Sequence, residues 1–126
     1  MTLEERVEYW IVTRIGAENA HRRERAMRLL EEAVELAQAE GVTEEMVNRQ
    51  TRHVFSRPAG DPAQEAAGVG VCLAGWCAAS GHSVVSLTLR ELERIEAKPV
   101  EQIRGSLARK QDADIVTAVP EEARKK

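Results

Sequence analysis

Residues 26–41 read AMRLLEEAVELAQAEG, and this stretch decides the fold class. Its apolar residues recur at steps of three and four, so that Leu30 and Val34 lie on one side of an α-helix. Gly41 follows as a helix stop, because glycine readily adopts the left-handed conformation that ends many helices. The pattern predicts an amphipathic helix from about residue 20 to residue 40.

Start and stop signals predict helices along nearly all of the chain. Thr2 and Glu5 have the spacing of a capping box, and Thr43 is an N-cap candidate for the helix that follows it. Asp61 and Pro62 favour the start of another helix, which runs to about Ser80. Ser83 can cap a further helix, and the last one spans about residues 99–110. The sequence therefore predicts an all-α protein.

The helix after Pro62 is almost entirely small and apolar. Glycines in a helix interior each cost about 1 kcal/mol of helix propensity, and this helix carries Gly68, Gly70 and Gly75. We expect the glycines to mark a close backbone approach, either in the middle of a bundle or beside a ligand. Cys72 and Cys77 lie in the same apolar run and are predicted to be core thiols, because no metal-binding Cys/His spacing is present.

No linker or repeat divides the chain, so we predict a single all-α domain over residues 1–110 and a polar tail over residues 111–126. A four-helix-bundle core with short accessory helices is the expected architecture. The net charge of −3 argues against a small DNA-binding regulator, which usually has a basic face, and we expect no nucleic-acid partner. No apolar run reaches the length of a membrane span, so a cytoplasmic protein without membrane contact is expected.

The predicted second helix carries three acids in a pattern that suits a metal ion. Glu32 and Glu35 are three positions apart and leave the same face, whereas Glu31 lies about 100° around the helix on a flank. Apolar residues surround all three, and half-buried carboxylates need partners. Mg²⁺ is such a partner, because it takes oxygen ligands and keeps waters for substrate phosphates.

A purely structural interpretation also fits these acids. Arg28 lies four positions before Glu32, and Arg25 lies three positions before Arg28. The acids therefore have salt-bridge partners on their own helix. Glu65 adds to the metal interpretation, because it is the one acid on the small apolar helix after Pro62. A carboxylate in a first helical turn is also stabilised by the helix dipole, which is the alternative explanation for Glu65.

Two segments resemble the all-α nucleotide pyrophosphohydrolases of the MazG-like type. That family has Glu-x-x-Glu on one helix and Glu-x-x-Asp on a later helix. The segment LEEAVEL at residues 30–36 matches the first half, and QEAAGV at residues 64–69 falls where the second half belongs. Gly68 stands in place of the second acid. A phage-borne branch is more similar still, because it shares the loop RPAGDP at residues 57–62. The resemblance covers roughly residues 20–110.

The resemblance implies hydrolysis of a nucleoside triphosphate to the monophosphate and pyrophosphate with Mg²⁺ or Mn²⁺. It makes Glu32, Glu35 and Glu65 metal ligands and makes Glu31 a further ligand or the residue that orients the attacking water. Asp61 or water would replace the acid missing at Gly68. The phage branch includes enzymes specific for purine deoxynucleotides such as dGTP, and the host cytoplasm would be the location of a phage-encoded protein. A homodimer or homotetramer is implied as well.

Positive side chains should stabilise the departing pyrophosphate. Arg104 and Lys110 on the last predicted helix, together with Arg28, are the candidates for contact with substrate phosphates, although surface solubility also explains each of them. Trp10 is a candidate for stacking on the base, with a place in the core as the alternative. A helical oligomerisation or interaction module that has lost catalytic activity is the second functional hypothesis, and Gly68 is its best support.

Overall fold

The helix with the three glutamates begins and ends where its flanking residues predict. It is α2 (Arg22–Ala39), and the His21 ring nitrogen Nδ1 accepts a hydrogen bond from the Glu24 amide at its N-terminus. Gly41 follows the C-terminus with φ of 84°, the left-handed conformation that glycine was expected to supply.

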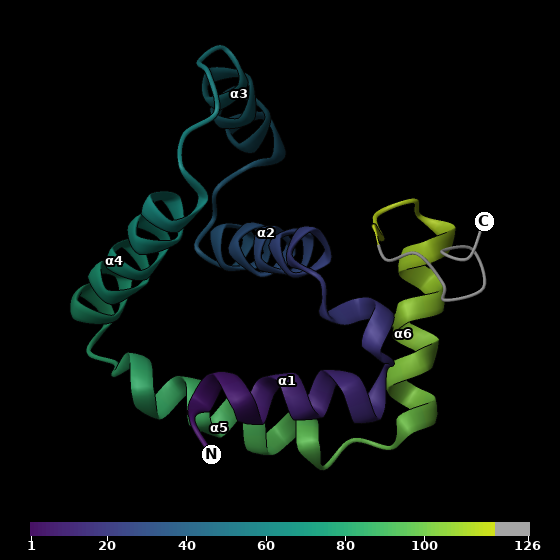
Figure 1. Cartoon of the computed structure of the whole chain (residues 1–126). Helices are drawn as coiled ribbons and strands as arrows, with labels where there is room; N and C mark the ends of the chain where they lie inside the picture. Colours follow the sequence, from purple (N-terminus) through teal and green to yellow (C-terminus); the bar gives the residue numbers. More distant parts are fainter. Residues whose placement is uncertain (118–126) are drawn as a thin grey trace. The chain divides into compact units, whose positions relative to one another are not determined.

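The computed structural model describes residues 1–117, and Figure 1 labels their helices. The elements in chain order are α1 (Leu3–Arg14), the short 3-10 helix η1 (Ala17–Ala20), α2 (Arg22–Ala39), α3 (Glu44–Phe55), α4 (Pro62–Ser80), α5 (Val84–Glu96) and α6 (Val100–Asp112). Within residues 1–117 there is no strand, so the predicted all-α class is confirmed.

The predicted caps are present as hydrogen bonds. Thr2 and Glu5 form a reciprocal capping box at α1, with both donor–acceptor distances at 3.1 Å. Thr43 caps α3, and the Asp61 carboxylate accepts from the Gln64 amide at 3.0 Å to cap α4. The Ser83 hydroxyl accepts a hydrogen bond from the Ser86 amide in the first turn of α5. These local signals are the reason that the helix boundaries follow from the sequence.

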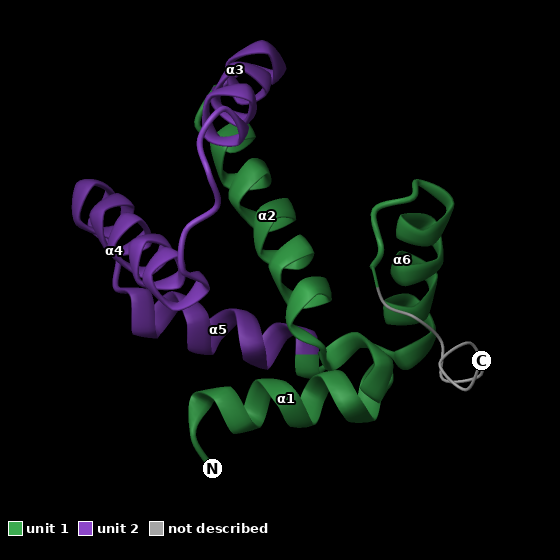
Figure 2. Cartoon of the chain, turned by 45° about the horizontal axis from the view of Figure 1, so that its top comes forward, with its two compact units in different colours: residues 1–41, 96–126 green, residues 42–95 purple. Residues whose placement is uncertain are grey.

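The chain divides into two compact units, coloured separately in Figure 2. Unit 1 contains residues 1–41 and 96–126, of which 118–126 lie outside the described residues, and unit 2 contains residues 42–95. The predicted tail covers residues 111–126, and most of it, residues 118–126, lies outside the described residues. Its first part does not extend away from the helices: α6 continues to Asp112, and the chain then turns back to contact α2.

Unit 1 is held together by polar contacts as well as by two buried isoleucines, Ile11 and Ile103. Arg6 on α1 binds Glu96 at the end of α5 with two hydrogen bonds, Nε to Oε2 at 3.0 Å and Nη2 to Oε1 at 2.5 Å. Arg14 Nη2 donates a hydrogen bond to the backbone carbonyl of Glu96. Asn19 of η1 is 2% exposed and donates to the Ile15 carbonyl. Glu96 thus connects α1 to the segment that leads to α6.

Unit 2 contains Cys77 and Leu92, both 3% exposed. Cys77 confirms the prediction of a core thiol, whereas the same prediction is wrong for Cys72, which is exposed; both cysteines are free. The Trp76 ring stacks on His82 with ring centroids 5.7 Å apart. This contact joins the end of α4 to the turn that precedes α5.

Much of the apolar surface that the sequence assigns to a core is exposed. The stripe on α2 includes Leu30 at 55% exposed, and α4 includes Val71 at 73%. An atom added as Cβ to Gly68, Gly70 or Gly75 would meet nothing within 4 Å. Within unit 2, therefore, no backbone makes the predicted close approach to these glycines.

None of the described helices alone combines the length and the apolar composition that crossing a membrane requires. Only α4 and α5 taken as a pair meet these criteria, and the two helices are bent by 100° relative to one another.

Candidate functional site

The three glutamates of α2 lie close enough together to share one cation. Glu31, Glu32 and Glu35 each offer a carboxylate oxygen, and these atoms lie within 4.8 Å of one another. Glu32 and Glu35 are exposed, whereas Glu31 is half-buried. The helical spacing predicted this cluster, because positions three and four apart are neighbours on a helix surface. We call these three residues the glutamate cluster.

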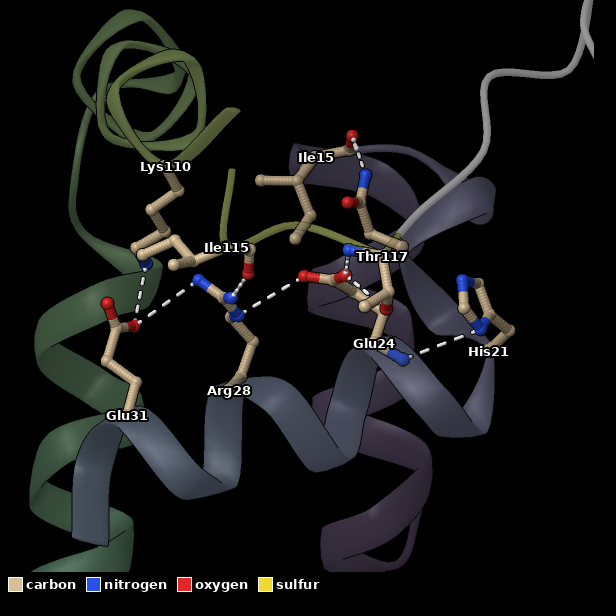
Figure 3. A network of polar contacts seen from close by, with 9 residues as sticks. Ile15, His21, Glu24, Arg28, Glu31, Lys110, Ile115 and Thr117 are labelled. Atoms are coloured by element: carbon tan, nitrogen blue, oxygen red, sulfur yellow. Dashed lines mark hydrogen bonds and ion pairs between the residues drawn. The ribbon is translucent and has the colours of Figure 1, made fainter. Parts of the chain in front are cut away.

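Two cations contact one oxygen of the half-buried glutamate. Lys110 of α6 places Nζ 3.1 Å from Glu31 Oε1, and Arg28 Nη1 lies 3.5 Å from the same oxygen. Figure 3 shows the two cations converging on Glu31 from different elements. The sequence proposed Glu31 as a metal ligand and both cations as phosphate contacts, and the structure joins these three residues in one site.

Arg28 connects the glutamate cluster to a second, buried carboxylate. Its Nε lies 3.2 Å from Glu24 Oε1, within ion-pair distance, and its Nη2 donates to the backbone carbonyl of Ile115. The sequence suggested an ion pair of Arg28 with Glu32 at i+4. The ion pairs of Arg28 within residues 1–117 join it instead to Glu31 at i+3 and to Glu24 at i−4.

Glu24 is the residue of this region that the sequence analysis missed. Its side chain is 1% exposed, and its Oε2 accepts hydrogen bonds from the Thr117 amide at 2.5 Å and from the Thr117 hydroxyl at 2.8 Å. A glutamate two residues into a helix resembles an ordinary first-turn acid, so its only sequence signal was its position near the N-cap. Glu24 and Thr117 are 93 positions apart, so their contact has no local signature in the sequence.

The start of α2 is crowded with positive charge. Burial lowers the pKa of the Arg25 guanidinium below its usual value, an effect that Glu24 opposes and Arg28 reinforces. Desolvation of this kind disfavours the charged form of a base. Glu24 therefore stabilises two neighbouring guanidinium groups at once, and its loss would leave both without their nearest buried anion.

The remaining predicted site residues lie elsewhere. Arg104 is exposed on α6 and forms no ion pair with the glutamate cluster. Trp10 is half-buried on α1, and its stacking role stays a prediction. Glu65 belongs to unit 2, in the first turn of α4.

Glu65 folds back over the loop that precedes α4. A Cβ added to Gly60 would lie 2.8 Å from Glu65 Oε1, so the missing side chain at Gly60 leaves the space that this carboxylate uses. Asp61, the candidate replacement for the acid missing at Gly68, is engaged as the N-cap of α4. The second half of the predicted metal site thus has one exposed acid, Glu65, and one capping acid, Asp61.

Comparisons with models of known protein families, with curated proteins and with solved structures found no match to this chain. Three carboxylates on one helix provide oxygen ligands for a hard divalent cation. Arg28 and Lys110 beside them provide donors for the oxygens of an anion such as a phosphate. This combination is suited to a ligand that consists of a divalent cation and a polyphosphate.

Proposed function

We propose that this protein is a metal-dependent nucleoside triphosphate pyrophosphohydrolase, with the glutamate cluster as its metal site. The observation that carries the proposal is the contact between Lys110 and Glu31, at 3.1 Å. It places a positive side chain from α6 beside a cluster of acids on α2. Metal-assisted phosphoryl chemistry needs both kinds of group next to each other, because the metal and the cations together neutralise the phosphate oxygens.

The ligand atoms of the glutamate cluster fit a magnesium-sized ion. Around an octahedral Mg²⁺, neighbouring oxygens are about 2.9 Å apart and opposite ones about 4.2 Å, whereas the three carboxylate oxygens lie within 4.8 Å of one another. The three side chains would draw closer together to bind one ion. The exposure of Glu32 and Glu35 suits Mg²⁺ or Mn²⁺, since such ions keep several water ligands when they bind a substrate.

Each residue would then have a defined role. A bound divalent cation lowers the pKa of a coordinated water and neutralises the triphosphate. Glu32 and Glu35 would hold the cation from the exposed face, while Glu31 would be a further ligand or would orient the attacking water. Lys110 and Arg28 would bind phosphate oxygens and stabilise the negative charge that develops on the leaving pyrophosphate.

The MazG-like pattern assigns Glu65, in the first turn of α4, to the metal ligands as well, and a four-helix-bundle core remains the proposed architecture. Water would fill the position that Gly68 leaves without an acid, because Asp61 already caps α4. Arg104 would be a more distant phosphate contact, and Trp10 would stack on the base. The choice of a purine deoxynucleotide such as dGTP rests on the resemblance to the phage-borne branch alone.

A homodimer or homotetramer is part of the proposal. The exposed apolar side chains of α4, among them Val69 and Val71, support it, because exposed apolar surface of this kind marks an interaction site. Light scattering of the purified chain measures the oligomer directly. A monodisperse species of 14.0 kDa would contradict this part of the proposal.

The test of the activity is a panel of nucleotides. The full chain is incubated with Mg²⁺ and each ribonucleoside and deoxynucleoside triphosphate in turn, and the products are identified by phosphorus NMR. Monophosphate and pyrophosphate in equal amounts, with dGTP among the fastest substrates, are expected. Release of inorganic phosphate instead, or no product with any nucleotide, would contradict the proposal.

The alternative is a helical oligomerisation module without catalytic activity. Gly68 in the acid position and the exposed apolar surface of α4 favour it. Calorimetric titration with Mn²⁺ distinguishes the two functions, because the module has no need of a cation. Binding that disappears in Glu32→Gln and Glu35→Gln supports the enzyme, whereas an assembled protein that binds no Mn²⁺ supports the module.

A further inference from the structure

The carboxyl group of Glu24 is buried, and its partners come from α2 and from the end of the described chain. The side chain is 1% exposed, so a negative charge there would lose nearly all contact with water. Such a group is tolerated only when hydrogen bonds and opposite charges compensate for the lost hydration. Two hydrogen bonds from Thr117 meet Oε2, and Arg28 Nε lies 3.2 Å from Oε1. The segment of residues 113–117 thus serves as a strap that covers the start of α2 (Figure 3).

The guanidinium of Arg28 is held on three sides. Nε contacts Glu24, Nη2 donates to the carbonyl of Ile115 in the strap, and Nη1 lies 3.5 Å from Glu31 Oε1. The side chain is only 15% exposed. Nη2 makes the directional hydrogen bond, while Nε and Nη1 make ion pairs without hydrogen-bond geometry, so the three contacts together restrict the orientation of the planar guanidinium.

We infer that Glu24 is a positioning residue for the glutamate cluster: together with the strap, it holds the Arg28 guanidinium against Glu31. This role rests on the proposed function, since it assigns Glu24 to the control of that site. Glu24 acts through Arg28, which the carboxylates of Glu24 and Glu31 share.

Glu24 and Glu31 compete for one guanidinium, and this competition can be measured. Loss of the Thr117 hydroxyl leaves Glu24 more dependent on Arg28, which draws the guanidinium away from Glu31 and frees that carboxylate for a cation. Loss of the Glu24 charge leaves Glu31 as the main partner of Arg28, and the site then has one negative charge fewer. The two changes should alter cation affinity in opposite directions.

The test is a calorimetric titration of the full chain with Mn²⁺. Thr117→Val should bind Mn²⁺ about threefold more tightly than the wild type, and Glu24→Gln about threefold more weakly. Thr51→Val is the matched control, because it removes a hydroxyl that bonds only within α3, and it should leave the affinity unchanged. Opposite shifts support the inference. Shifts of the same sign, or no shift in either variant, overturn it, because a merely structural role would weaken binding in both.

Hydrogen exchange separates the strap from the proposed function, because it needs no metal. The Thr117 amide should be protected in the wild type and should exchange about tenfold faster in Glu24→Ala. The Ile103 amide, which bonds to the Pro99 carbonyl at the start of α6, lies outside the strap and is the internal control. An unprotected Thr117 amide in the wild type would overturn the positioning role. A protected amide in a chain that binds no Mn²⁺ would contradict the proposed function while the strap itself is confirmed.

Discussion

Lys110 Nζ lies 3.1 Å from Glu31 Oε1, and this contact joins the last helix of the described chain to the acids of α2. Neither residue is fully exposed, with 26% of the lysine and 23% of the glutamate side chain accessible. Partial burial reduces screening by water and salt, so the ammonium group influences anything that binds at Glu31. If the proposed site binds a cation and a phosphate, this contact links the two affinities.

Replacement of Lys110 should change these two affinities in opposite directions. In Lys110→Gln, the KM for a nucleoside triphosphate should rise about tenfold, because a cation that binds phosphate oxygens is lost. Mn²⁺ should bind more tightly, because Glu31 loses a competing positive charge. Steady-state kinetics and calorimetry measure the two effects. Arg109→Gln, an equal charge change at the exposed neighbouring position, should leave both constants close to the wild-type values.

Glu35 should be essential for activity and unimportant for stability. Glu35→Gln keeps the size of the side chain but removes a charged ligand, so kcat should fall at least about 100-fold. The side chain is exposed, so urea unfolding should give the same midpoint as the wild type. Glu40→Gln, another exposed glutamate at the end of α2, serves as the control and should retain full activity. Product formation at the wild-type rate by Glu35→Gln would falsify the assignment of this carboxylate.

Arg28 should be important for stability because it compensates a buried charge. Arg28→Met removes the guanidinium that lies 3.2 Å from Glu24 Oε1, and loss of one member of a buried pair costs about 3 kcal/mol. Urea unfolding measures the difference. Arg49→Met is the matched control, because Arg49 pairs with Glu45 at 3.8 Å while both side chains are about two-thirds exposed. Such surface pairs contribute about 0.5 kcal/mol or less. Equal destabilisation by the two variants would contradict the role of Arg28 as the partner of a buried acid.

The helices could be predicted from the sequence because their signals are local. A cap such as Thr43 or Asp61 acts on an amide three residues away, and a stop such as Gly81 acts through its own backbone conformation. The glutamate cluster was predictable for the same reason, since helical geometry alone places Glu32 and Glu35 on one face.

The contacts that hold the cluster in place could not be predicted in this way. The partner of Glu24 is Thr117, and the partner of Glu31 is Lys110, so each pair depends on the path of the whole chain. The burial of single residues could not be predicted from the sequence either. Cys72 and Cys77 occupy the same apolar run, yet only Cys77 is buried, because burial depends on which side of α4 meets a neighbour.

The ion pair of Arg6 with Glu96 should make stability depend on acidic pH. Hydrogen bonds from Arg6 hold the pKa of the Glu96 carboxyl below its usual value. The charged carboxylate therefore stabilises the folded state above the unfolded-state pKa, and this contribution is lost as the pH falls through the lower, folded-state value. The relevant window lies below about pH 4.3, the ordinary value for glutamate.

Glu96→Gln removes this contribution, so the expected result is lower stability at neutral pH and a weaker loss of stability on acidification. Urea midpoints measured at several pH values between neutrality and pH 3 give the comparison. Glu93→Gln is the matched control, because Glu93 is an exposed glutamate on the same helix and forms no ion pair with a residue of the described chain. It should keep the pH dependence of the wild type. A Glu96→Gln curve parallel to that of the wild type would show that Arg6 does not stabilise the charged form of Glu96.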